Sequence, residues 1–68
     1  MSTTALTYAV PGVSCEHCRA AITAEVSKVA GVEQVDVDLD AKRVTVTGTA
    51  VDDAAVRAAI DEAGYDVA

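Results

Sequence analysis

The sequence has 68 residues, the length of one small domain, so a two-domain organisation is excluded and residues 1–68 are expected to form a single unit. Apolar residues make up 51% and charged residues 24%, as in globular proteins. The net charge of −6 repels phosphate backbones and anionic lipids, so neither nucleic acid nor a membrane surface is an expected partner. No run is long enough to span a bilayer, and residues 1–6 lack signal-peptide regions, which predicts a cytoplasmic protein.

The first half of the chain predicts a strand followed by a helix. Leu6, Tyr8 and Val10 alternate with Thr7 and Ala9, which indicates a strand over residues 4–10. Pro11-Gly12 ends this strand. Ser14 then has the residue type of a helix N-cap, and Gly31 that of the residue after a helix end. The apolar stripe of this helix consists of Cys18, Ile22, Val26 and Val29.

The second half predicts a hairpin, a second helix and a last strand. Alternating valines predict strands over 35–40 and 44–47, joined by a turn at 40–42. Asp52 is the predicted N-cap of the second helix, with Val51 and Val56 spaced as a hydrophobic staple. Gly64 is the predicted end of this helix, and residues 65–68 form a short edge strand.

Two strand–helix–strand units with crossovers of the same sense predict an α+β sandwich. It consists of a four-stranded antiparallel sheet with both helices on one face, in the order βαββαβ. The other face of the sheet carries a polar row into water, and solvation alone accounts for it. This row consists of Asp36, Asp38, Asp40, Thr45 and Thr47.

The segment Gly12-Val13-Ser14-Cys15-Glu16-His17-Cys18 contains both cysteines and the only histidine. Cys15 is expected near the first helical position, and residues three apart share one helix face. Two sulfurs that bind one metal lie at most about 4.6 Å apart, twice a metal–sulfur bond. The free N–H groups and the dipole at a helix start favour thiolates. Thiolates are soft ligands, which select Cu(I) among the common intracellular metals. Because the segment supplies only two sulfurs, the bound metal stays accessible, which suits delivery rather than storage.

Other interpretations of this segment remain open. Both cysteines can be small packed side chains, although this does not explain Cys15 at a helix start. A structural zinc site needs four ligands, and the segment offers three candidates. A small dithiol oxidoreductase of the thioredoxin type needs a longer chain and a proline after the cysteines, whereas Pro11 precedes them. A carrier for mercury, zinc or cadmium is a further alternative.

The Gly12-x-x-Cys15-x-x-Cys18 loop, placed between a first strand and a first helix, resembles the heavy-metal-associated domain over essentially the whole chain. The resemblance is strongest to free-standing bacterial copper chaperones, among which the Cys-x-His-Cys spacing is familiar. It implies a ferredoxin-like fold, Cu(I) held by Cys15 and Cys18, and transfer to the soluble domain of a copper-transporting P-type ATPase. It also implies a protein without catalytic activity.

The surroundings of the metal include further candidates, among them Ser14, which is expected more as a helix cap than as a metal residue. Tyr65 follows the second helix, and it either shields and hydrogen-bonds the cysteines or packs at the last strand. Val13 stands where the family has methionine, which predicts a slightly more mobile loop. His17 is an exposed helix-start residue, a modulator of the cysteine pKa values, or a third ligand in a metal-bridged dimer. We expect a monomer without metal and a copper-bridged homodimer as a loaded form.

Overall fold

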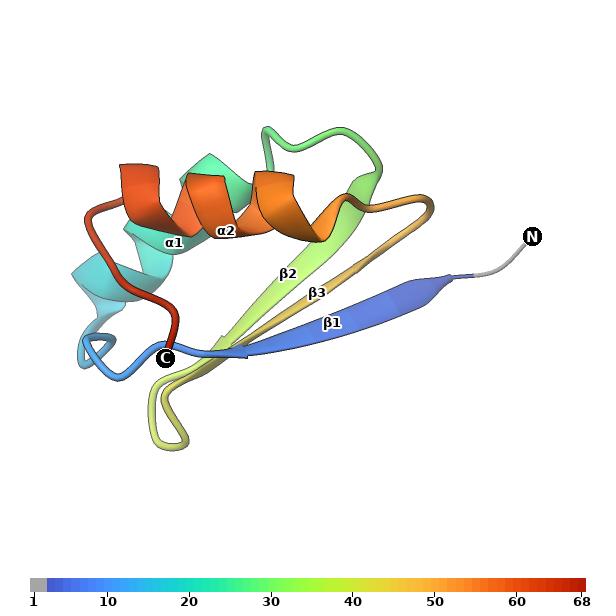
Figure 1. Ribbon diagram of the computed structural model, residues 1–68. Coiled ribbons are helices and arrows are strands. Elements are labelled where there is room, and N and C mark those ends of the chain that lie inside the picture. Colours follow the sequence, from blue (N-terminus) through green and yellow to red (C-terminus); the bar gives the residue numbers. More distant parts are fainter. Residues whose placement is uncertain (1–2) are drawn as a thin grey trace.

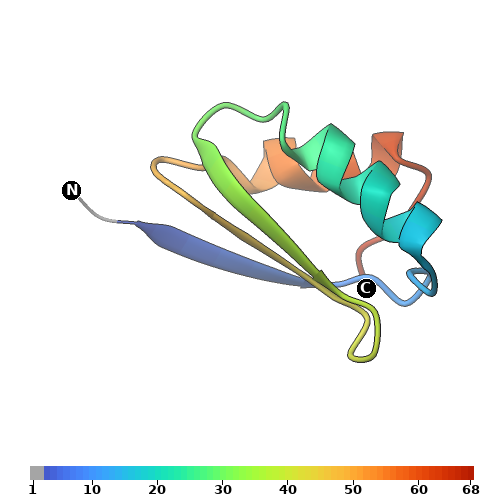
Figure 2. The ribbon, with the colours of Figure 1, turned by 180° about the vertical axis from the view of Figure 1, so that it is seen from behind.

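The computed structural model describes residues 3–68, so Met1 and Ser2, at the start of the segment that lacks signal-peptide regions, lie outside the described residues. The elements are β1 (Thr4–Ala9), α1 (Glu16–Val26), β2 (Val32–Asp38), β3 (Arg43–Gly48) and α2 (Asp53–Glu62). The strands form an antiparallel sheet in the order β1-β3-β2, and both helices cover one face of it (Figures 1 and 2). The predicted α+β class and the position of the helices are confirmed.

The core lies between the sheet and the two helices. Val46 of β3 is paired with Leu6 on one side and Val35 on the other, and two residues away Val44 is paired with Tyr8 and Val37. Because side chains alternate along a strand, these two rows point to the same face, toward the helices. The side chains with no exposed surface in this core are Val10, Val13, Ile22, Val26, Val44, Val46, Val56 and Ile60.

The predicted fourth strand is wrong, because the described residues form three strands. Residues 65–68 run back beside β1 and make one backbone hydrogen bond with it, from Ala68 N to Ala9 O at 2.8 Å. Tyr65 and Val67 are half-buried and pack against the core. This segment therefore covers the core with two side chains, but it makes too few backbone hydrogen bonds with β1 to count as a strand.

Both predicted boundaries of the first helix are wrong. Cys15 is still extended (φ −151°, ψ 173°), so it occupies the N-cap position and its carbonyl accepts the first helical bond, from Arg19 N at 3.1 Å. Ser14 therefore lies one residue outside the cap. The helix ends at Val26 rather than before Gly31. Gly31 instead allows a close approach between segments, since a Cβ there would lie 2.3 Å from Thr49 O.

The predicted boundaries of the second helix are confirmed. The Asp52 carboxylate accepts a hydrogen bond from Ala54 N at 3.0 Å and caps α2. At the other end, Gly64 has φ +92° and donates to Asp61 O at 2.9 Å, while Tyr65 N donates to Ile60 O at 3.1 Å. This pair of bonds is a Schellman motif, which glycine at a positive φ makes possible. The reversal directs Tyr65 back toward the β1–α1 loop (residues 10–15).

Candidate metal centre

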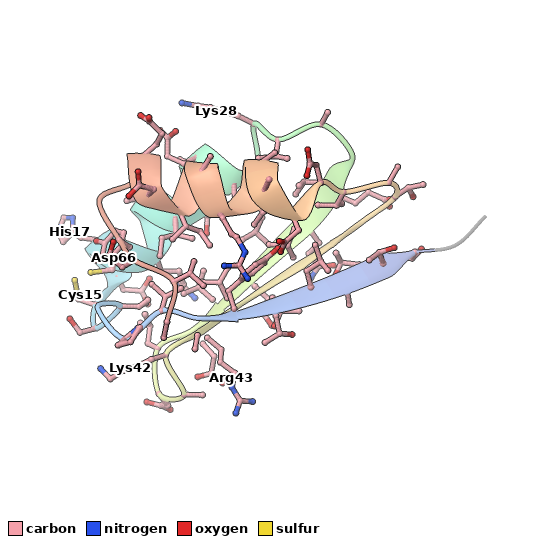
Figure 3. All side chains as sticks on the ribbon, in the orientation of Figure 1. Cys15, His17, Lys28, Lys42, Arg43 and Asp66 are labelled. Carbon is pink, nitrogen blue, oxygen red and sulfur yellow. The ribbon has the colours of Figure 1, made fainter. Side chains whose placement is uncertain are left out.

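The two cysteines meet where the β1–α1 loop leads into α1, at the end of the molecule where Cys15 lies in Figure 3. Their Sγ atoms lie 3.4 Å apart, and both thiols are free. Cys15 is exposed at the N-cap, and Cys18 is half-buried in the first turn, where it packs against the core. The separation lies within the roughly 4.6 Å that two sulfurs on one metal ion can span. The two sulfur atoms are therefore close enough for a single metal ion to reach both.

The Cys18 thiol is acidified by its neighbours. A hydrogen bond with the Tyr65 hydroxyl has the largest effect, followed by backbone hydrogen bonding at Ser14 and by the Cys15 thiol, and together they lower the pKa of Cys18 to about 6. The same contact raises the pKa of Tyr65 above its ordinary value. Hydrogen bonds to the charged form favour that form, so these contacts favour the thiolate of Cys18.

Tyr65 lies between the core and the β1–α1 loop. Its ring packs against the core and lies beside the loop, since a Cβ on Gly12 would be 3.5 Å from Tyr65 Cδ2. Its hydroxyl acts on the Cys18 thiol. Thiolate stabilisation was expected from the helix start, whereas the largest effect on Cys18 comes from this side chain.

The remaining predicted residues lie around the pair without joining it. His17 is exposed in the first turn of α1, and its ring projects outward at the end of the molecule (Figure 3). Among residues 3–68, no three histidine, cysteine or carboxylate side chains come close enough to hold one metal ion. Ser14 contributes its backbone to the Cys18 thiol rather than a capping hydroxyl. Within one chain, the candidate ligand set is therefore Cys15 and Cys18.

Lys42, which no sequence pattern indicated as a site residue, contacts the same loop. Its ammonium donates to the Val13 carbonyl at 3.3 Å, although 29 positions separate the two residues. Val13 is fully buried, so its side chain packs inward, as the family resemblance implied. No local pattern signals a contact between a hairpin turn and a distant loop, because it depends on how the sheet aligns the two segments.

Comparisons with known proteins agree with this fold. Residues 7–66 match the model of the heavy-metal-associated domain. The chain is 42% identical over 60 residues to a copper chaperone CopZ of Staphylococcus epidermidis, covering 85% of this chain and 88% of that protein. It is 41% identical over 64 residues to a copper chaperone CopZ of Bacillus subtilis, covering 91% and 93%. A solved CopZ metallochaperone superposes with a TM-score of 0.90 at 31% identity, covering 96% of this chain and all of that one.

The chain belongs to the heavy-metal-associated domain family. The match begins within β1 and ends in the segment after α2, and therefore includes the two cysteines and Tyr65. Among residues 3–68, no helix has the combination of length and apolar character needed to cross a membrane.

Proposed function

We propose that this chain is a cytoplasmic copper chaperone that holds one Cu(I) ion between Cys15 and Cys18. The observation that carries the proposal is the pair of free thiols 3.4 Å apart at an exposed helix start, one of which is acidified to a pKa of about 6. Relatives named copper chaperones, about 40% identical over most of the chain, support carriage of metal rather than catalysis.

The donor set favours Cu(I) over other intracellular metals. Thiolates are soft ligands, which select Cu(I), whereas tetrahedral zinc sites use four protein ligands. The described residues bring together two sulfurs and no third ligand. A Cu(I) ion with two thiolates remains accessible to a further sulfur, and this openness suits delivery to a partner.

The proposed transfer is an exchange of sulfur ligands at constant oxidation state. A thiolate of the partner bonds to the copper and gives a three-coordinate bridge, after which the bond to Cys15 breaks. A second thiolate of the partner then replaces Cys18 in the same way, and each freed sulfur takes up a proton that a partner thiol gave up. Cys15 leaves first because it is exposed and lies at the end of the loop, whereas Cys18 is anchored in α1 against the core. The proposed partner is the soluble domain of a copper-transporting P-type ATPase.

The metal-loaded form also has a proposed dimer, in which copper bridges two copies of the chain. The outward position of His17 fits a role as third ligand in such a dimer or as a modulator near the thiols. Without metal the proposed state is a monomer. Native mass spectrometry of the loaded His17→Ala variant tests this role, because loss of the dimer with retention of one copper per chain is the expected result.

Anaerobic titration with Cu(I), read by native mass spectrometry, tests the main proposal. The wild-type chain is expected to retain copper against a competing chelator, whereas Cys15→Ser and Cys18→Ser lose it. A single-cysteine variant that retains copper as well as the wild type contradicts the assignment. Parallel titrations with Hg(II), Zn(II) and Cd(II) address the other metal carriers. Reduction of insulin disulfides without any response to copper would instead favour a dithiol oxidoreductase.

A further inference from the structure

Lys42 lies at the end of the hairpin turn between β2 and β3, on the same end of the molecule as the β1–α1 loop (Figures 1 and 3). The Asp38 carboxylate organises this turn by accepting hydrogen bonds from Asp40 N at 3.0 Å and Ala41 N at 3.1 Å. Lys42 itself has φ +56°, a conformation that residues other than glycine adopt infrequently. The turn therefore holds the Lys42 backbone in a defined orientation relative to the loop.

Lys42 binds both ends of one four-residue turn. Its carbonyl accepts a hydrogen bond from Val10 N at 2.9 Å, and its ammonium donates to Val13 O at 3.3 Å. Val13 N in turn donates to Val10 O at 3.1 Å and closes the Val10–Val13 turn. Cys15 follows this turn by two residues, so the direction in which its thiol is presented depends on where Val13 is held.

Among the described residues, no carboxylate forms an ion pair with the ammonium of Lys42. Within residues 3–68, the ion pairs join Arg19 to Glu16, Lys28 to Glu25, and Arg57 to Asp53. The Lys42 ammonium is instead bonded to the loop. A charged donor on a carbonyl forms a stronger hydrogen bond than a neutral one.

We propose that Lys42 is a positioning residue of the metal site: its ammonium holds the Val13 carbonyl, stiffens the turn before Cys15 and slows the release of copper by that cysteine. The effect on the loop concerns the metal-free protein and stands on the two hydrogen bonds alone. The effect on copper release rests on the proposed chaperone function. Lys42 acts through Val13 and does not touch the metal.

The test compares Lys42→Met with Lys42→Arg and Arg43→Met. Methionine keeps the backbone carbonyl and most of the stem but removes the charged donor, arginine restores a charged donor, and Arg43→Met removes the adjacent charge without altering the loop contact. Amide hydrogen exchange is measured in the metal-free proteins. In Lys42→Met, the Val13 amide is expected to exchange about three- to tenfold faster, the effect of losing one hydrogen bond of typical net strength. In Arg43→Met and Lys42→Arg, the rate is expected to match the wild type.

The second readout is the rate at which Cu(I) passes to a competing chelator such as bathocuproine disulfonate. Lys42→Met is expected to release copper about threefold faster or more, with Lys42→Arg restoring the wild-type rate.

Two outcomes overturn the proposal. One is a Val13 exchange rate that is equal in Lys42→Met and the wild type, and the other is an equal change of that rate in Lys42→Met and Arg43→Met. Lys42→Gln replaces Lys42→Met where circular dichroism shows that the latter is unfolded. If no protein binds Cu(I), the chaperone function fails, and amide exchange still decides the role of Lys42 in the loop.

Discussion

The Tyr8 hydroxyl donates a 2.6 Å hydrogen bond to the Asp53 carboxylate, which joins β1 to the first turn of α2. Arg57 completes the group, since its Nε donates to the other Asp53 oxygen at 3.0 Å and its guanidinium lies 5.7 Å from the centre of the Tyr8 ring. Tyr8 is only 4% exposed, so its ring is part of the core while its hydroxyl reaches the surface. This contact connects the sheet to α2.

Replacing Tyr8 by phenylalanine removes the hydroxyl and keeps the ring. We expect the free energy of unfolding at neutral pH to fall by about 1 kcal/mol, the net contribution of a typical hydrogen bond, because Asp53 can regain a water partner. Urea denaturation of wild type and Tyr8→Phe measures this difference. An unchanged midpoint would show that the Tyr8–Asp53 bond contributes nothing to stability.

The same contact makes stability depend on pH in the alkaline range. Burial, followed by the hydrogen bond to Asp53, raises the pKa of Tyr8 to about 12 from the ordinary value of 10. Between these values the unfolded chain loses the tyrosine proton first, so the stabilisation is fully present below pH 10 and is lost as the pH rises through about 12. The difference in unfolding free energy between wild type and Tyr8→Phe is therefore expected to shrink over this range. A constant difference contradicts the assignment.

Removal of the Tyr65 hydroxyl should make the Cys18 thiol less acidic. Because that hydroxyl has the largest effect in lowering the Cys18 pKa to about 6, Tyr65→Phe is expected to slow alkylation by iodoacetamide near pH 6, by up to about tenfold per pKa unit gained. The rates are measured in a Cys15→Ser background, so that only Cys18 reacts. Tyr8→Phe in the same background is the control, and an equal rate in all three proteins would exclude a role for Tyr65.

The two helix starts differ in how they are capped, and alanine substitutions distinguish them. Asp52→Ala removes the carboxylate that accepts the Ala54 amide and should cost about 1 kcal/mol of unfolding free energy. Ser14→Ala is expected to cost little, because Ser14 lies outside the N-cap position that Cys15 occupies. Thermal or urea unfolding of the two variants measures both costs. An equal loss of unfolding free energy in the two variants would show that Ser14 caps α1 after all.

Glycine is required where β3 ends, and far less in the cysteine loop. A Cβ on Gly48 would lie 2.0 Å from Gly31 O, which the backbone can relieve only by moving apart. Gly48→Ala is therefore expected to lower the unfolding free energy by about 2–4 kcal/mol. At Gly12 the nearest atom is Tyr65 Cδ2 at 3.5 Å, an ordinary contact, so Gly12→Ala is the matched control with a small effect.

Much of the fold followed from local patterns. The alternation of Val44 and Val46 with threonines predicted β3, and Asp52 and Gly64 marked the ends of α2, because caps are recognised from single residue types. The same reasoning placed the cap of α1 on Ser14. It was wrong because the backbone stays extended through Cys15, and this depends on the turn that Val10 and Val13 close. Residue type alone does not report that geometry.

The site was predictable where its residues are close in sequence. Cys15 and Cys18 are three residues apart, so their spacing alone predicted that the two thiols would be neighbours. Partners that are distant in the sequence were harder to predict. Tyr65 came from the family resemblance, and Lys42 was missed, because its contact with Val13 requires the hairpin and the loop to be aligned by the sheet. The error over the fourth strand has a similar origin, since a short apolar segment indicates burial without indicating how many backbone bonds it makes.

The chain passes from full burial at Val13 to open solvent at Cys15 within two residues. This abrupt boundary separates the part of the molecule that must stay packed from the part that must move. Cys15 is not part of the core that contains Ile22 and Val26, so in the proposed transfer its bond to copper can break without any helix or strand shifting. In the proposed transfer a partner therefore meets an essentially rigid body in which the Cys15 side chain is the part that turns, and the loop that carries this side chain governs how readily it does so.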